Sequence, residues 1–204
     1  ERTFLMSGKK IWSLIYPALI VFGVIFLIEH FFIEFTQVSG PSMSPNLTDK
    51  QMVLAFKGQQ LEHGDVITFN AAKVDPKASL GTLYVKRVIG LPGDTVEARD
   101  GKIYVNNQKI NENFISSKQQ KNTGDWTLNS LSVKNSWRKR GNYIRVPNNE
   151  YFVLGDNRKV SKDSRYFGFV PSDAIVGKVK VPFWWSINQA EKENINQEHH
   201  DFYE

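Results

Sequence analysis

The sequence predicts a mainly β protein: an antiparallel β-sheet domain that carries a small inserted cap and follows one N-terminal transmembrane helix. Three observations predict this fold. An uncharged apolar run lies near the N-terminus, short apolar runs alternate with turn residues after it, and a polar stretch rich in Asn, Ser and Lys interrupts those runs. The expected segments are residues 1–10 (a short N-terminal segment), 11–35 (the anchor helix), 36–186 (the β domain, with the cap at 111–145) and 187–204 (an acidic tail).

The anchor is expected because residues 11–28 contain no charged side chain. As a helix rising ~1.5 Å per residue, this run would be about 27 Å long, close to the ~30 Å thickness of a bilayer core. A cleavable secretory signal and a buried core helix are alternatives, but no small-x-small site follows the run and few globular helices stay uncharged for so long. Arg2, Lys9 and Lys10 precede the run, so the N-terminus is expected in the cytoplasm and the bulk of the chain outside the cell membrane.

Seven short runs rich in β-branched and aromatic residues are expected to form the strands of the β domain. They are residues 52–56, 66–69, 82–89, 95–98, 102–105, 151–154 and 174–181. Chain-reversing sequences lie between them, at 63–65, 91–94, 100–101 and 105–108. In the polar insertion, Trp126 and Trp137 are the large side chains expected to anchor the cap. The tail is expected to be disordered or loosely helical.

Composition excludes several kinds of chemistry. The chain has no Cys, so it has no disulfide, no thiol nucleophile and no Cys-based metal site. The four histidines are scattered, at His30, His63, His199 and His200, and predict no metal site beyond adventitious binding by the last pair. No cofactor is expected. The tail carries a net charge of −4 and residues 37–186 carry +9, which is compatible with nucleic acid, an anionic membrane surface or simple solubility.

A first candidate for chemistry is Ser42, within residues 39–47. Gly40, Pro41 and Pro45 stiffen the backbone around it without offering a regular hydrogen-bond ladder. A serine on such a bend has an exposed hydroxyl and free N–H groups nearby, as an oxyanion site requires. A plain linker between anchor and domain is the alternative.

A second candidate is Lys86, in the strand expected over residues 82–89. Both faces of this strand are largely apolar, so the amine is expected to be partly desolvated. Desolvation lowers the pKa of a lysine and can leave a neutral amine that accepts a proton near pH 7. The alternative is a lysine that extends from a sheet edge into water.

A third candidate is the loop at residues 155–165, which packs many polar side chains directly after an apolar strand. It suits a buried hydrogen-bonded support, with a solvated charged loop as the alternative. Serine with a neutral lysine can replace the Ser-His-Asp triad in attack on a carbonyl. Among the histidines only His63, in a turn, competes with Lys86 as the base.

These three segments carry a specific resemblance. Residues 42–45 (SMSP), 84–87 (YVKR) with 90–94 (GLPGD), and 155–165 (GDNRKVSKDSR) resemble the three signature boxes of type I signal peptidases, in the family's order. The single anchor and the compact size are similar to Gram-positive bacterial members. The resemblance implies a membrane-anchored serine endopeptidase that removes signal peptides from exported preproteins after small residues (Ala-x-Ala).

The resemblance also implies roles for individual residues. Ser42 would be the nucleophile and an oxyanion donor through its N–H, Lys86 the general base, and Ser161 the hydroxyl that orients the lysine amine. The structural supports of the site would be Asp156, Arg158, Asp163 and Arg165. The shallow pockets for small substrate side chains would be lined by Val38, Met43, Leu47, Tyr84 and Val85.

The chain departs from the family pattern at three places. Gly40 stands where some Gram-negative members have a serine that completes the oxyanion hole, Asn46 replaces a threonine often found after the proline, and 111–145 corresponds to a variable cap.

Three aromatic residues near the end of the β domain either enter the membrane interface or fill the β core: Phe183, Trp184 and Trp185.

The expected partners are secreted preproteins and the lipid bilayer, with no nucleic acid. The oligomeric state is not predicted. Two other hypotheses remain: a non-catalytic relative that assists pilus or envelope assembly, and a self-cleaving Ser-Lys regulator, which would need a DNA-binding domain where this chain has the apolar run.

Overall fold

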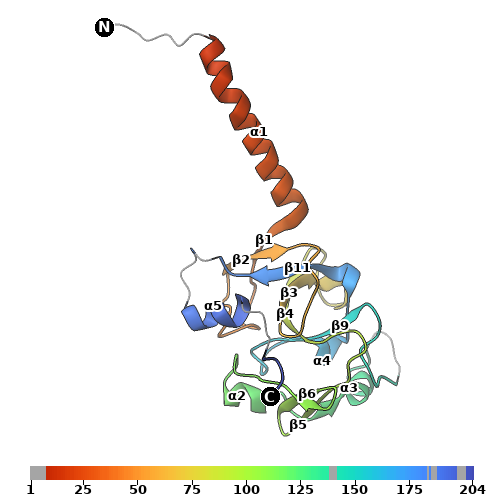
Figure 1. Ribbon diagram of the computed structural model, residues 1–204. Helices are drawn as coiled ribbons and strands as arrows, with labels where there is room; N and C mark the ends of the chain where they lie inside the picture. Colours follow the sequence, from red (N-terminus) through yellow and green to blue (C-terminus); the bar gives the residue numbers. More distant parts are fainter. Residues whose placement is uncertain (1–7, 138–141, 183, 185–187, 197–200) are drawn as a thin grey trace.

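The computed structural model describes residues 8–137, 142–182, 184, 188–196 and 201–204. Helix α1 (Gly8–Phe32) projects away from a domain made of two antiparallel sheets (Figure 1). The side chains of residues 8–11, 14 and 28–30 within it lie outside the described set. Over the part of the chain that is described, no helix combines the length and the apolar character needed to cross a membrane.

The helix ends three residues earlier than the anchor boundary expected at residue 35. Strand β1 (Ile33–Gln37) begins there and pairs antiparallel with β2 along its whole length, from Ile33 opposite Phe56 to Gln37 opposite Met52. Thr36 is buried by this pairing. The expected boundary was wrong because hydropathy alone does not separate an apolar strand from the apolar helix before it.

The larger sheet has seven strands in the order β1-β2-β11-β3-β4-β9-β10. The strands other than β1 are β2 (Met52–Phe56), β3 (Val66–Asn70), β4 (Leu83–Gly90), β9 (Glu150–Leu154), β10 (Val170–Pro171) and β11 (Ile175–Lys180). Strand β4 pairs with β3 over residues 83–87 and with β9 only from Arg87 onward. This offset leaves one edge of β4 unpaired by β9 around Lys86.

The smaller sheet has four strands in the order β7-β6-β5-β8. They are β5 (Val96–Arg99), β6 (Lys102–Val105), β7 (Gln108–Lys109) and β8 (Trp126–Thr127). The predicted turns between them adopt left-handed backbone angles at Asp100, Gly101, Asn106 and Asn107, as two-residue hairpin loops require. All seven predicted strands are confirmed.

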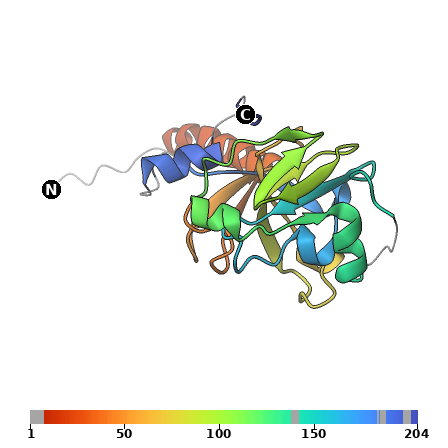
Figure 2. The same cartoon turned by 90° about the horizontal axis from the view of Figure 1, so that it is seen from below.

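The predicted cap supplies β8 and two short helices, α2 (Ser117–Lys121) and α3 (Leu128–Lys134), which lie on opposite sides of the small sheet (Figure 1 and Figure 2). Trp126 and Trp137 are buried in the apolar cluster beneath it, as expected of anchoring side chains. The remaining helices are α4 (Ser164–Phe167), α5 (Gln189–Asn196) and the 3-10 turns η1 (Ala71–Lys73) and η2 (Ser172–Ala174).

The acidic tail is more ordered than its composition predicts. Residues 189–196 form α5, and Ile195 is buried in an apolar cluster with residues of β2, β11, β3 and β4. Phe202 is buried in the other cluster and stacks on His63, with ring centroids 4.7 Å apart. Burial of these two apolar side chains stabilises the described parts of a segment that is otherwise charged.

Candidate active site

Two groups from distant parts of the chain meet at the centre of the domain. Ser42 lies in the loop between β1 and β2, and Lys86 lies in the middle of β4. The lysine Nζ is 2.8 Å from the serine Oγ. The lysine side chain is buried, with 3% of its surface exposed, while Ser42 is half-buried and so accessible from one side. The structure therefore brings together the predicted nucleophile and base.

The loop that carries Ser42 is held by the loop after β9. Asn157 donates its backbone N–H to the Ser42 carbonyl (3.0 Å) and its Nδ2 to the Pro41 carbonyl (3.2 Å). On the other side, Gly40 N–H donates to Asp49 Oδ1 (2.7 Å). These bonds fix the backbone without engaging the serine hydroxyl, which is left to Lys86.

Gly155 is the point of closest approach between the two loops. A Cβ placed on it would lie 2.1 Å from Ser161 Oγ and 2.5 Å from the Ser42 carbonyl oxygen. Any larger residue at this position would therefore force the Ser42 backbone to move, so only glycine allows the two loops to approach this closely. Gly155 therefore sets how closely the third motif approaches Ser42.

We expect Gly155→Ala to lower kcat about 100-fold, because a shift of the Ser42 loop by roughly 1 Å disrupts its geometry with Lys86. Steady-state kinetics with a peptide substrate measures the effect, and circular dichroism checks that the variant is folded. A folded variant with wild-type kcat would contradict this account of the contact.

Burial governs the protonation of Lys86. Desolvation lowers the pKa of the amine from 10.5 to about 8, and this effect outweighs the opposing influence of the Asp163 and Asp156 carboxylates. Both carboxylates are paired with arginines, which reduces their hold on the ammonium form. The amine also lies 2.8 Å from the Val85 carbonyl oxygen, which fixes its position.

Asp156 is held by Arg87, the residue that follows Lys86. Arg87 Nε and Nη2 donate to the two oxygens of Asp156 at 2.9 and 2.7 Å, and both side chains are 0% exposed. Asn46 Nδ2 donates to Asp156 Oδ2 (2.7 Å) and to the Phe114 carbonyl in the cap (2.7 Å). The sequence motifs contain Arg87, but its role was missed, because spacing alone does not reveal a partner 69 residues away.

Two further ion pairs support the loop after β9. Arg165 donates through Nε and Nη2 to both oxygens of Asp163 (2.9 Å each), and Asp163 Oδ2 accepts Gly155 N–H (3.0 Å). Arg158 donates to the Gly155 carbonyl (3.0 Å) and, through Nη1, to Glu112 in the cap (2.7 Å). Glu112 was not foreseen, because nothing in the polar insertion distinguishes one carboxylate from another.

Ser161 differs from its expected arrangement. Its Oγ is buried but makes no hydrogen bond within the described part of the chain. The expected bond to the lysine amine is absent there, since the amine lies against the Val85 carbonyl and Ser42 instead. Ser161 packs beside Gly155, so it lies close to the site, and its orienting role stays a prediction.

A family model described as signal peptidase, peptidase S26, matches residues 11–184. The chain belongs to this family. It is a type I signal peptidase, a serine protease, as the motifs predicted.

Two relatives found by sequence agree with that assignment. Signal peptidase IB of Staphylococcus aureus (strain COL) is 37% identical over 180 residues, covering 86% of this chain and 91% of that protein. A probable signal peptidase I-2 of Synechocystis is 30% identical over 188 residues, covering 90% and 75%. A crystal structure of a signal peptidase I from Enterococcus faecalis V583 is 35% identical, with a TM-score of 0.48, covering 59% of this chain and 97% of that one.

The five residues predicted to line the substrate pockets of this signal peptidase do not all lie in one cluster. Four of them are buried in one apolar cluster that also contains Ile195 of α5: Val38, Met43, Leu47 and Val85. Tyr84 lies apart from them, against Phe69 and Phe167, and its hydroxyl donates to Asp75 Oδ2 (2.9 Å). Burial and this bond raise the pKa of Tyr84 to about 12.

The loop that carries Ser42 also determines which backbone N–H groups are available as oxyanion donors. Ser42 N–H donates no hydrogen bond to any described residue. Gly40 has a positive φ of 78° and no side chain, and its own N–H is engaged by Asp49. Gly40 therefore offers no second donor in this conformation, and Ser42 N–H stays the predicted one.

Of the aromatic residues predicted at the membrane, only Trp184 is described. It is 63% exposed, so it does not fill the β core. Phe183 and Trp185 lie outside the described residues. The membrane contact of all three stays a prediction.

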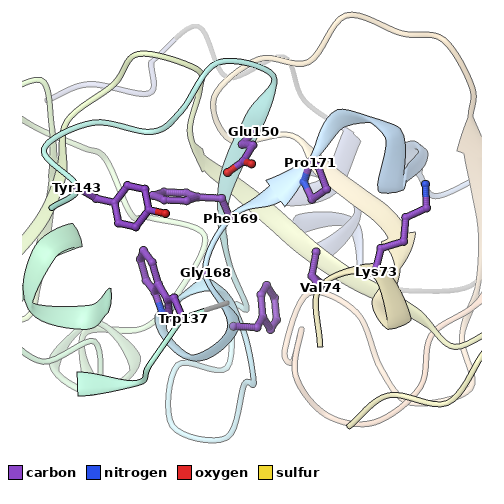
Figure 3. Close-up of a pocket in the computed structure, with 9 residues that line it drawn as sticks. Lys73, Val74, Trp137, Tyr143, Glu150, Gly168, Phe169 and Pro171 are labelled. Atoms are coloured by element: carbon purple, nitrogen blue, oxygen red, sulfur yellow. The ribbon is translucent and has the colours of Figure 1, made fainter. Parts of the chain in front are cut away.

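A separate hollow lies at the junction of the cap with the large sheet (Figure 3). Trp137, Tyr143 and Phe169 form one wall of it, with Val74 and Pro171 across the opening. It contains neither Ser42 nor Lys86. The described residues also include no cluster of three or more His, Asp or Glu side chains that could hold a metal ion.

Proposed function

We propose that this signal peptidase cleaves N-terminal signal peptides from exported preproteins after Ala-x-Ala, with Ser42 as nucleophile and Lys86 as general base. The observation that carries the proposal is the 2.8 Å separation of Lys86 Nζ and Ser42 Oγ, with the lysine buried. A buried amine with a pKa near 8 is partly neutral at physiological pH and can accept the serine proton.

The reaction proceeds through an acyl-enzyme. Lys86 Nζ takes the Ser42 proton as Oγ attacks the scissile carbonyl carbon, and the developing oxyanion accepts a hydrogen bond from Ser42 N–H. The lysine then donates this proton to the leaving amine as the C–N bond breaks, which releases the mature protein. Water attacks the ester next, giving its proton to Lys86, and the signal peptide leaves with a new carboxylate as Ser42 regains its proton.

We also propose that residues 11–32 hold the enzyme at the membrane, with the N-terminus cytoplasmic and the β domain extracytoplasmic. Helix α1 projects from the domain and exposes large apolar side chains along its length, including Trp12, Leu19 and Phe22. Exposed apolar surface of this extent needs an apolar surrounding. A tethered nucleophile close to the bilayer would find cleavage sites without a three-dimensional search.

The proposal is tested with a preprotein that carries Ala-x-Ala before its mature sequence. Incubation with the enzyme in detergent, followed by mass spectrometry, is expected to yield a new N-terminus directly after the second alanine. Ser42→Ala protein serves as the control and should leave the preprotein intact. Cleavage elsewhere, or equal cleavage by the control, would refute the assignment.

The reaction should also depend on pH. Because the base must be neutral and its pKa is about 8, kcat/KM is expected to fall as the pH drops below that value, by about tenfold per unit. Measuring kcat/KM between about pH 6 and pH 10 locates this limb. A profile that stays flat to the acid end would show that no titrating lysine serves as the base.

A further inference from the structure

The C-terminal helix α5 contacts Arg87 and Asn46, two buried residues close in sequence to Lys86 and Ser42. It lies at the end of β11 (Figure 1), beyond the part of the chain that matches the family. Asn196 is fixed there by exchanging hydrogen bonds with Val181, at 2.7 Å in both directions, and its carbonyl accepts Lys180 Nζ (2.6 Å). Cations at the carbonyl end of a helix are favourable partners of its dipole.

Asn194 of this helix makes two contacts with the site. Its carbonyl accepts a hydrogen bond from Arg87 Nη1 (2.9 Å). Its side-chain Nδ2 donates to Asn46 Oδ1 (2.8 Å). Asn46 and Arg87 are the same two residues that bind the carboxylate of Asp156.

Together these bonds close a ring through Asn194, Arg87, Asp156 and Asn46. The last three are buried, at no more than 1% exposure, so each polar atom depends on its partners in the ring. Arg87 follows Lys86 in β4, and Asn46 is four residues after Ser42. The ring therefore joins the strand that carries the base to the loop that carries the nucleophile.

We infer that Asn194 is a positioning residue for the Ser42–Lys86 pair, acting through Asn46, Arg87 and Asp156. This inference rests on the proposed function for its effect on turnover, although its effect on the lysine amine can be measured without turnover. The helix that bears Asn194 is anchored by Ile195, which packs in the apolar cluster with Met43 and Val85.

The expected effect on Lys86 follows from the groups that face its amine. These are the Ser42 hydroxyl, the ring of Tyr84 at 5.2 Å, and the carboxylates of Asp156 and Asp163. Removing the Asn194 side chain frees Asn46 and loosens the hold on Asp156, which admits water and frees negative charge near the amine. Both changes favour the ammonium form, so the pKa of Lys86 should rise.

The test compares Asn194→Ala and Asn194→Asp with Glu193→Ala in the full-length chain. The aspartate variant keeps the size of the asparagine side chain but cannot donate a hydrogen bond to Asn46. It replaces the alanine variant in the test if that variant does not fold. Glu193 is an exposed neighbour whose side chain bonds only within the same helix, to Gln189 among described residues. We expect both Asn194 variants to lower kcat by about tenfold with KM little changed.

The acid limb of kcat should also move up by roughly 0.5–1 pH unit in these variants. NMR of 13Cε-labelled lysine follows the same amine directly, with Lys86→Met used to assign its signal. An unchanged Lys86 titration and kcat, even with reduced thermal stability, would overturn the inference and leave Asn194 a purely structural residue. Failure of the wild-type enzyme to cleave preprotein would instead refute the proposed function, while the NMR titration still decides on Asn194.

Discussion

Lys86→Met is expected to reduce kcat for preprotein cleavage by on the order of 10⁴-fold or more, the scale seen when a general base is removed from a serine hydrolase. Methionine matches the length of the lysine stem and fills the same buried slot, but it cannot accept the Ser42 proton. Nζ lies 2.8 Å from Oγ, and no other titratable side chain is described within hydrogen-bonding distance of that oxygen.

The same substitution should make the protein more stable. Burial of the lysine amine is unfavourable, since desolvation lowers its pKa from 10.5 to about 8. An apolar side chain of similar volume avoids that cost. Loss of activity together with a gain in thermal stability separates a catalytic role from a structural one, because substitution of a purely structural residue would lower both the activity and the stability of the protein.

The measurements are preprotein cleavage by gel or mass spectrometry and the melting temperature by calorimetry. Lys118→Met, at an exposed position on α2, is the matched control and should change neither. A Lys86→Met enzyme that cleaves at the wild-type rate would remove lysine from the mechanism.

What could be predicted from the sequence is mostly local. The strand that carries Lys86 and the turns around it follow from short-range alternation and from the backbone preferences of Gly, Asn and Pro. The pairing of Lys86 with Ser42, 44 residues apart, came from the recognised motifs rather than from periodicity. Burial of the amine was predicted correctly because both faces of its strand are apolar.

What could not be predicted depends on distant partners. Strands β8 and β10 have two residues each, too few to show any alternation, and exist only through pairing with β5 and β9. The order of the tail depends on Ile195 and Phe202, whose buried sites are formed by other segments. The bond expected between Ser161 and Lys86 is not made in the described part of the chain, where the lysine amine lies 2.8 Å from the Val85 carbonyl oxygen.

The second large effect concerns stability. Asp156→Ala is expected to lower the free energy of unfolding by about 3–5 kcal/mol, because it leaves the Arg87 guanidinium buried without its counter-ion. Both side chains are 0% exposed, and Arg87 donates two hydrogen bonds to this carboxylate. The substitution also removes one of the two acceptors of Asn46 Nδ2, which leaves that buried amide with only its bond to the Phe114 carbonyl.

Urea denaturation followed by tryptophan fluorescence measures this loss. The control is Asp173→Ala, which removes the carboxylate of the exposed Lys73–Asp173 pair, where the aspartate side chain is 73% exposed. Water solvates both of those charges, so this change should cost less than about 1 kcal/mol. If the two variants were equally stable, the Arg87–Asp156 pair would not be the buried electrostatic support of the catalytic strand, and the ring that joins Lys86 to the Ser42 loop would lose its central member.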